Sequence, residues 1–203
     1  PSRGLGDVYK RQLYPNPASV LAFIENHDTD RFLGEGNNLP MLKQASTLLL
    51  TTRRIPQLYY GTEVMMNGVK SKSDGYVRKD FPGGWTGDAT NALTPAGRTK
   101  IQNECYDFYK TILNWRKGND VIAKGSMVQF MVQNGVYAYA RQYEGKTIFV
   151  MLNGTDAETT VPLKFYKEIL KDSKQGKDIL SGKAITFGEE LKMGPRESLV
   201  IEL

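Results

Sequence analysis

The sequence is poor in the residues that build metal and redox sites: its 203 residues contain one cysteine, Cys105, and one histidine, His27. A single cysteine excludes an internal disulfide and a cysteine-based zinc site. A single histidine excludes a pair of imidazole ligands at helical spacing. No apolar run approaches the roughly 18 residues that a membrane-spanning helix needs. No Gly-x-Ser-x-Gly sequence marks a nucleophilic serine at a strand–helix turn.

A strong excess of one charge sign is also missing. Lys and Arg number 27, Asp and Glu number 22, and the net charge is +5. In the richest stretch, residues 164–192, lysines are interleaved with acidic residues, which is typical of a solvated surface. The apolar share of 40% is that of an ordinary globular protein. We therefore expect a folded protein with a hydrophobic core that binds neither nucleic acid nor membrane.

The chain divides into three parts by composition and period. Residues 1–12, PSRGLGDVYKRQ, resemble translated adapter sequence and lack the apolar core of a signal peptide, so we treat them as a non-native or artefactual tail. Residues 13–119 alternate short apolar runs with helical periodicity, whereas residues 120–203 alternate with a period of two. These patterns predict an α/β part followed by an antiparallel all-β domain.

In the α/β part, the pattern predicts two strands, two helices and a long loop. The apolar runs at 20–24 and 57–60 are typical of parallel strands buried on both faces. Helical spacing predicts one helix over 40–53 and another that begins after a Thr94 N-cap. The glycine-rich stretch 69–91 predicts a long loop, and such loops in compact domains are usually functional.

Two strands and two helices are too few for a complete eight-stranded βα barrel, which needs about 250 residues. Two strands also make a poor sheet on their own. The predicted elements therefore match the end of a larger α/β architecture better than a complete one.

The second half has the signals of antiparallel hairpins. Period-two segments predict strands over 127–133, 136–143 and 146–152. Asn134-Gly135 and Glu144-Gly145 are turn signals that join these strands. The alternation of apolar and polar residues at the end of the chain predicts a closing strand.

The sharpest chemical pattern is FIENHD at residues 23–28. An apolar strand delivers carboxylates, an amide and an imidazole at its carboxyl end, where active sites gather in parallel α/β architectures. From the residues alone, an ordinary hydrogen-bonded pair of His27 and Asp28 remains the alternative.

This pattern and two others resemble the α-amylase family, glycoside hydrolase family 13. Residues 23–28 resemble its fourth conserved region, F-x-x-N-H-D, and residues 59–63, YYGTE, resemble its eighth barrel strand. Residues 75–85, GYVRKDFPGGW, resemble the loop after that strand in the neopullulanase and cyclomaltodextrinase branch. The resemblance implies the last two βα units of a TIM (β/α)8 barrel over 13–119, followed by a C-terminal β-sandwich domain over 120–203.

The resemblance implies retaining hydrolysis of α-glucosidic bonds in maltodextrins, pullulan or cyclodextrins. Retaining glycosidases use a nucleophile and an acid/base, and this family adds a third carboxylate that stabilises the oxocarbenium-like transition state. Asp28 matches that third carboxylate. His27 matches a histidine that binds sugar hydroxyls, with Asn26 beside it, and Asp74 and Arg78 lie where related enzymes hold the non-reducing side of the substrate.

Alternatives stay open for the loop residues. Asp74 and Arg78 are also explained by a surface ion pair. Trp85 and Tyr76 either stack on sugar rings or pack the loop on its own aromatics. Cys105 lies on the apolar stripe of a predicted helix, so we expect it in the core.

In this family the nucleophile and the acid/base lie on barrel strands four and five, and this chain contains no residues that match them. We therefore expect a C-terminal fragment that is inactive alone. No cofactor or metal is implied for these residues, whereas calcium binding stays open for the full-length enzyme. A homodimer and either a periplasmic or a cytoplasmic location also stay open.

A non-catalytic starch- or protein-binding β module is the competing interpretation. Aromatic residues expected on exposed strand faces, such as Tyr137 and Tyr139, favour it. The pair His27-Asp28 at a strand end beside a long loop favours the enzyme, because a binding module has no need of that arrangement.

Overall fold

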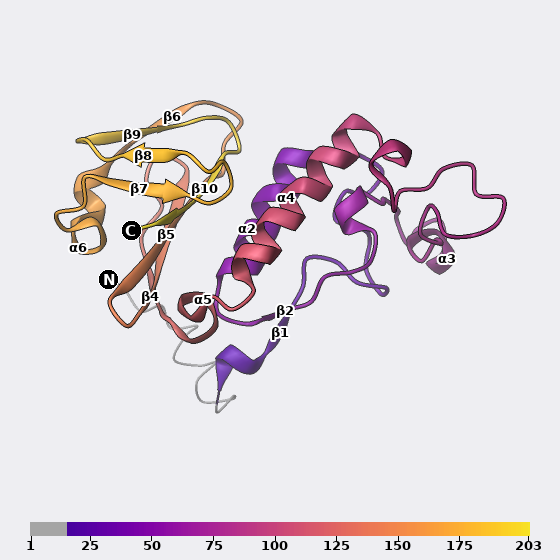
Figure 1. The fold of residues 1–203 in the computed structure, drawn as a ribbon, viewed down its shortest axis with the longest axis horizontal. Coiled ribbons are helices and arrows are strands. Elements are labelled where there is room, and N and C mark those ends of the chain that lie inside the picture. The colour runs from indigo at the N-terminus through magenta and orange to yellow at the C-terminus, as the bar shows by residue number, and fades with distance from the viewer. Residues whose placement is uncertain (1–15) are drawn as a thin grey trace.

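Two long helices and a six-stranded sheet dominate the computed structural model, which describes residues 16–203 (Figure 1). The helical part contains, in chain order, η1 (Pro17–Ser19), β1 (Leu21–Ala22), α2 (Leu39–Thr51), β2 (Ile55–Pro56), η2 (Thr62–Val64), α3 (Asp74–Val77), η3 (Pro95–Gly97) and α4 (Lys100–Arg116). The sheet part contains α5 (Asp120–Lys124), β3 (Ser126–Gln129), β4 (Val136–Tyr143), β5 (Lys146–Asn153), β6 (Thr159–Pro162), η4 (Leu163–Tyr166), α6 (Lys167–Leu170), β7 (Gln175–Asp178), β8 (Ala184–Thr186), β9 (Glu190–Met193) and β10 (Ser198–Glu202). The tail assigned to residues 1–12 lies outside the described residues.

The strands β1 and β2 pair in parallel, with α2 between them along the chain. The strand predicted over 20–24 is too long, because only Leu21–Ala22 forms a strand. The strand predicted over 57–60 is misplaced, because β2 is Ile55–Pro56, directly before it. Burial on both faces is wrong as well: Leu21 is 51% exposed and Ile55 is 52% exposed. No other strand of the described residues pairs with this ladder, so its edges and side chains remain uncovered.

The start of α4 differs from the prediction. Thr94 does accept a hydrogen bond from the amide of Gly97, but it caps the short helix η3. Thr99 caps α4 by accepting a hydrogen bond from the amide of Gln102, and the amide of Thr99 donates to Oε1 of Gln102, which completes a capping box. The chain therefore has two successive caps, and the second one satisfies two backbone amides of the long helix instead of one.

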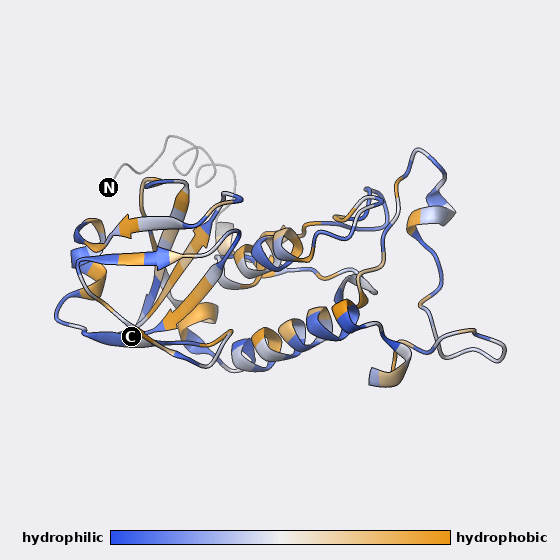
Figure 2. Ribbon diagram, turned by 90° about the horizontal axis from the view of Figure 1, so that it is seen from above, coloured by the Kyte–Doolittle hydropathy of each residue, from blue (hydrophilic) through white to orange (hydrophobic). Residues whose placement is uncertain are grey.

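The helices α2 and α4 lie side by side and share one apolar cluster (Figures 1 and 2). Seven buried residues form it: Leu39, Leu42, Leu50, Cys105, Phe108, Tyr109 and Ile112. The expectation that Cys105 belongs to the core is confirmed, since it is fully buried. This burial raises the pKa of the Cys105 thiol to about 12.

We expect Cys105 to resist thiol reagents in the native protein. The thiolate is the reactive form, so a pKa near 12 lowers reactivity at pH 8 on the order of 10³-fold relative to a free cysteine. The measurement is the rate of reaction with a disulfide reagent in buffer and in 6 M guanidinium chloride. Equal rates in the two conditions would contradict this prediction.

The large sheet has the strand order β3-β4-β5-β10-β7-β8, and β6 pairs with β9 in a second sheet. Both predicted hairpin turns are confirmed. Asn134-Gly135 closes the bridge between Gln133 and Val136, and Glu144-Gly145 joins β4 to β5, with positive φ at all four turn residues.

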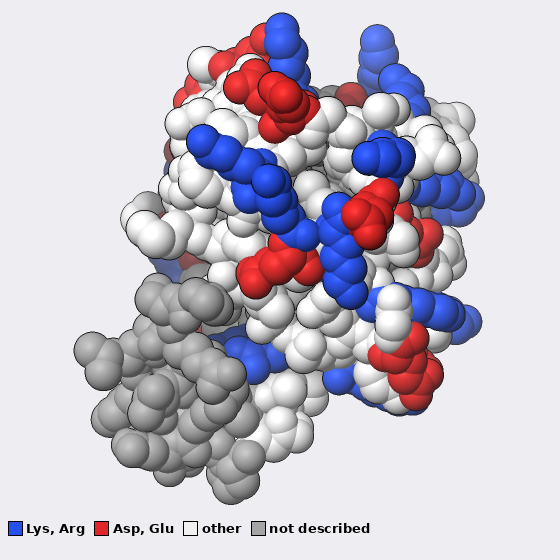
Figure 3. All heavy atoms as spheres, turned by 90° about the vertical axis from the view of Figure 1, so that its left-hand side faces the viewer, with Lys and Arg blue, Asp and Glu red and all other residues white. Residues whose placement is uncertain are grey.

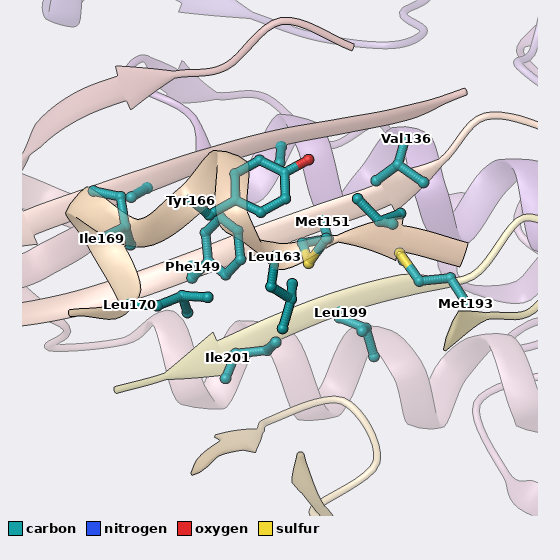
Figure 4. Packing of buried hydrophobic residues seen from close by; sticks show 13 residues of the cluster. Val136, Phe149, Met151, Leu163, Tyr166, Ile169, Leu170, Met193, Leu199 and Ile201 are labelled. Atoms are coloured by element: carbon teal, nitrogen blue, oxygen red, sulfur yellow. The ribbon is translucent and has the colours of Figure 1, made fainter. Parts of the chain in front are cut away.

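Each face of the large sheet buries its own apolar cluster. On one face, Phe149, Leu199 and Ile201 pack with η4, α6 and β9, as Figure 4 shows. On the other face, Val150 and Val200 pack against α5 and against Trp115 at the end of α4. The sheet is therefore covered on both sides, which explains why its central strands β5 and β10 are largely apolar.

Tyr139 is fully buried, so the prediction that it lies exposed on a strand face is wrong. Its hydroxyl lies 2.5 Å from Oγ1 of Thr51, at the end of α2. The nearby Arg141 is buried as well, and its guanidinium donates to the carbonyls of Thr51, Ile122 and Gly125 at 2.8–2.9 Å. The bonds to Thr51 join the sheet to the helical part.

The surface of the sheet part carries both charge signs. On the face shown in Figure 3, Lys and Arg side chains are scattered among Asp and Glu side chains. Within the described residues, no helix is long and apolar enough to cross a membrane.

Candidate functional site

The turn after β1 holds the candidate catalytic residues in place through its own side chains. The amide of Asp28 donates to Oδ1 of Asn26 at 2.8 Å, and the amide of Asn26 donates to Oγ1 of Thr29 at 3.0 Å. Asn26 thus shapes the turn, and the side chains of His27 and Asp28 remain 59% and 63% exposed. The two lie beside each other, with 3.2 Å between His27 Nε2 and Asp28 Oδ2.

The long loop contributes its residues through a short helix. Ser73 caps α3 by accepting a hydrogen bond from the amide of Tyr76. Asp74 then begins the helix and Arg78 follows it, four residues later, on the same helical face. The Nη2 atom of Arg78 lies 3.1 Å from Oδ2 of Asp74.

Arg78 connects this helix to the turn after β1. Its Nη2 donates to Oδ1 of Asp28 at 3.2 Å, and its Nε donates to the carbonyl of His27 at 3.0 Å. The structure therefore brings His27, Asp28, Asp74 and Arg78 into one cluster, although about 50 residues separate the two pairs.

Lys70 also belongs to this cluster, although no sequence motif predicted it. Its Nζ donates to the carbonyl of Asp28 at 3.0 Å and lies 3.4 Å from Oδ1 of Asp74. Its own amide donates to Asp30 at 2.6 Å. The spacing of Lys70 and Asp74, four residues apart, was the one available signal, and it carries no information about Asp28.

The buried ion pair of Glu25 and Arg31 lies beside the cluster and holds its backbone in place. Glu25 and Arg31 have 2% and 0% of their side chains exposed, and Arg31 Nη1 lies 3.5 Å from Glu25 Oε1. Glu25 also accepts from the amide of Phe32 at 2.5 Å and from the hydroxyl of Thr62. Buried charges persist only where partners surround them, so this pair fixes the turn after β1 against η2.

Arg31 reaches the other segments of the site. It donates to the carbonyl of Tyr60 at 2.6 Å and to the carbonyl of Val77 at 3.1 Å. Its guanidinium carbon lies 3.9 Å from the ring centre of Tyr59. Arg31 therefore contacts the segment that follows β2 and also α3, the helix that carries Asp74.

Of the two aromatic residues proposed for sugar stacking, only Trp85 presents an open ring. Trp85 is 71% exposed. The Tyr76 ring lies within 4.6 Å of Lys72 Nζ and 4.0 Å of Lys79 Nζ.

The cluster suits neutral, hydroxyl-rich ligands better than a cation. Carboxylates and cations alternate in it, so charges are largely balanced while hydrogen-bond donors and acceptors face solvent. Among residues 16–203, no three His, Cys, Asp or Glu side chains form a group that could hold a metal ion. The acidic residues here have Lys70 and Arg78 as partners.

Comparisons with known proteins agree with the fold and the motifs. Residues 127–202 match the family described as the cyclo-malto-dextrinase C-terminal domain. An α-amylase from Niallia circulans is 30% identical over 176 residues, which are 83% of this chain. A cyclomaltodextrin glucanotransferase from Thermoanaerobacterium thermosulfurigenes is 31% identical over 168 residues, or 79% of this chain.

The chain belongs to the α-amylase family. Its fold agrees with this membership: the α-amylase from Geobacillus thermoleovorans superposes with a TM-score of 0.74 over 98% of this chain, at 24% identity. A debranching enzyme from Nostoc punctiforme superposes with a TM-score of 0.68 at 17% identity.

This α-amylase-family chain spans only part of those proteins. It covers 29% and 21% of the two curated relatives and 42% of the Geobacillus structure. The activity and substrates of a whole enzyme are therefore proposals for this chain.

Proposed function

We propose that this chain belongs to a retaining glycoside hydrolase that cleaves α-glucosidic bonds of maltodextrins, pullulan or cyclodextrins. The observation that supports it best is the cluster of His27, Asp28, Asp74 and Arg78, which joins a strand-end turn to the long loop. The match of the sheet part to a cyclo-malto-dextrinase domain favours the neopullulanase and cyclomaltodextrinase branch.

In this proposal Asp28 stabilises the transition state. Positive charge develops on the sugar ring as the glycosidic bond breaks. A fixed carboxylate beside that ring stabilises the transition state more than the neutral ground state, which is the condition for catalysis. His27 would donate to sugar hydroxyls, and Arg78 holds the backbone and carboxylate of the turn in place.

Asp74 and Arg78, with Asn26, complete the proposed substrate site. Arg78 contacts two carboxylates and a carbonyl, so its orientation is fixed before a sugar arrives. Lys70 adds a second donor beside Asp74. The nucleophile and the acid/base would come from earlier strands of the barrel, of which β1 and β2 would be the last two strands.

The open edges of β1 and β2 support this placement. Leu21 and Ile55 in these strands are 51% and 52% exposed, and Phe23 directly after β1 is 43% exposed, which is unusual for apolar residues at parallel strands of an α/β fold. Further parallel strands on both sides would cover them. A calcium ion in the longer enzyme and its assembly as a homodimer stay proposals without support from these residues.

The test compares the 203-residue chain with the longer enzyme that contains it. Each is incubated with maltodextrin, pullulan and β-cyclodextrin, and proton NMR records the anomer that forms first. We expect the longer enzyme to release the α-anomer and the chain alone to release no sugar. Initial release of the β-anomer by the longer enzyme would contradict a retaining mechanism.

A further inference from the structure

A cavity of about 600 Å³ lies at the C-terminal end of α4, whereas α3 lies beyond the other end of that helix (Figure 1). The residues after α4, the turn between β4 and β5, and the end of β10 line it. Its volume is within the range of about 300–1,000 Å³ that is usual for small-molecule sites. Because it lies at the opposite end of α4 from α3, the cavity is separate from the cluster around Asp28.

Two aromatic side chains line this cavity, and one is held firmly. Trp115 and Tyr143 are both partly exposed there. The indole Nε1 of Trp115 donates to Oε1 of Glu202 at 2.7 Å, and its ring packs against the apolar clusters of both parts of the molecule. An aromatic ring fixed in this way offers a stacking surface with little entropy to lose.

The charged groups of the cavity have mixed signs. They are Lys117, Asp120, Glu144, Lys146 and Glu202, which are two cations and three carboxylates. Within residues 16–203, the side chains of Lys117, Glu144 and Lys146 form no hydrogen bond or ion pair with other side chains. The cavity thus combines aromatic surface with free donors and acceptors but no strong net charge, which suits a neutral polyol.

The cavity between α2, α4 and β10 differs in this respect. It has a volume of about 430 Å³, and both cations that line it are already paired with carboxylates of this chain. Lys43 lies 2.6 Å from Glu104, and Arg196 lies 2.7 Å from Asp156. A ligand there would have to break these pairs, so the larger cavity is the better candidate.

We propose that the cavity at Trp115 and Tyr143 is a second binding site for α-glucan oligosaccharides. The choice of an α-glucan rests on the proposed function, while the preference for a neutral sugar rests on the cavity itself. A glucose ring presents an apolar face of C–H groups that stacks on an aromatic ring, and its hydroxyls pair with carboxylates and ammonium groups. The site would hold a substrate chain near the enzyme without taking part in the reaction.

The experiment uses two unique reporters in the 203-residue chain. Trp85 and Trp115 are its two tryptophans, so in the variant Trp85→Phe all indole fluorescence comes from Trp115. His27 is its one histidine, so the imidazole NMR signal reports the cluster around Asp28. Maltoheptaose is titrated into this variant while both signals are recorded, and cellohexaose serves as the β-linked control.

We expect a saturable change in Trp115 fluorescence with maltoheptaose and a much smaller one with cellohexaose. Adding Tyr143→Ala should weaken this binding about tenfold, the equivalent of one stacking contact. Phe165→Ala, which removes an aromatic ring that is 45% exposed elsewhere on the sheet part, should leave it unchanged. Equilibrium dialysis of maltoheptaose provides a second readout if a variant loses fluorescence, and circular dichroism shows that each compared variant is folded.

The two reporters separate this inference from the proposed function. The second site would be overturned if maltoheptaose left the Trp115 fluorescence unchanged and dialysis gave the same affinity for Trp85→Phe and Trp85→Phe/Tyr143→Ala. This conclusion would hold for any change in the His27 NMR signal. A Trp115 response that cellohexaose reproduces equally would overturn the assignment to α-glucans. A Trp115 response that persists in Asp28→Asn supports a site that does not depend on the catalytic cluster.

Discussion

The change Asp28→Asn in a longer enzyme that contains this chain is expected to lower kcat on maltodextrin on the order of 10³-fold. Asparagine has the same shape as aspartate but no charge, so it removes the electrostatic stabilisation of the oxocarbenium-like transition state. KM should change by less than about fivefold, because the ground-state sugar is neutral and Asn can still accept a hydrogen bond. Initial rates over a range of maltodextrin concentrations measure both parameters.

Two further variants make this result specific. Asp74→Asn should mainly raise KM, because in the proposal Asp74 orients the substrate-binding Arg78 and takes no part in the chemical step. Asp156→Asn is the matched control: this carboxylate is 80% exposed and pairs with Arg196 on the sheet part, so both parameters should stay at their original values. If Asp28→Asn keeps kcat within about threefold, Asp28 is not the transition-state stabiliser.

The sequence predicted the hairpins well, because their signals are local. Asn134-Gly135 and Glu144-Gly145 adopt the positive φ angles that their turns require, and the strand predicted over 136–143 coincides with β4. The strands from β6 to β9 were not predicted individually. They have three or four residues each and carry many exposed polar side chains, as in Gln175–Asp178, so their periodicity is too short to detect.

The parallel strands show that an apolar run does not by itself predict the length or the burial of a strand. The run at 20–24 has the composition of a buried strand, yet only Leu21 and Ala22 pair and Phe23 is 43% exposed. Whether a strand is buried depends on the strands beside it. The apolar composition of residues 20–24 is that of a strand with neighbours on both sides. The exposure of these apolar residues therefore indicates that further strands should lie next to them.

In the candidate site, too, some residues could be predicted from the sequence and others could not. The motifs named Asn26, His27, Asp28, Asp74 and Arg78. The structure places His27, Asp28, Asp74 and Arg78 in one cluster of polar contacts, and Asn26 shapes the turn. Arg31 and Lys70 were missed. Arg31 contacts the carbonyls of Tyr60 and Val77, which lie 29 and 46 residues away, and Lys70 contacts the carbonyl of Asp28, 42 residues away. A periodicity argument cannot detect contacts at such separations.

The buried pair of Glu25 and Arg31 gives the largest expected effect on stability. Arg31→Met keeps the length and packing of the side chain but leaves the Glu25 carboxylate buried without its cation. It also leaves the carbonyls of Tyr60 and Val77 without their donors. Breaking one partner of a buried pair costs about 3–5 kcal/mol, so we expect the free energy of unfolding to fall by that amount. Urea unfolding followed by circular dichroism measures it.

A double-mutant cycle separates the pair from its surroundings. Glu25→Leu/Arg31→Met removes both charges, so it should recover part of the stability that Arg31→Met loses, since an apolar replacement of a buried pair is often close to neutral. Arg78→Met is the matched control, because this arginine is 40% exposed and its ion pairs should contribute less than about 1 kcal/mol. If Arg31→Met is no more destabilising than Arg78→Met, the buried pair does not hold the turn after β1 in place. The cluster around Asp28 would then depend on Arg78 and Lys70 alone.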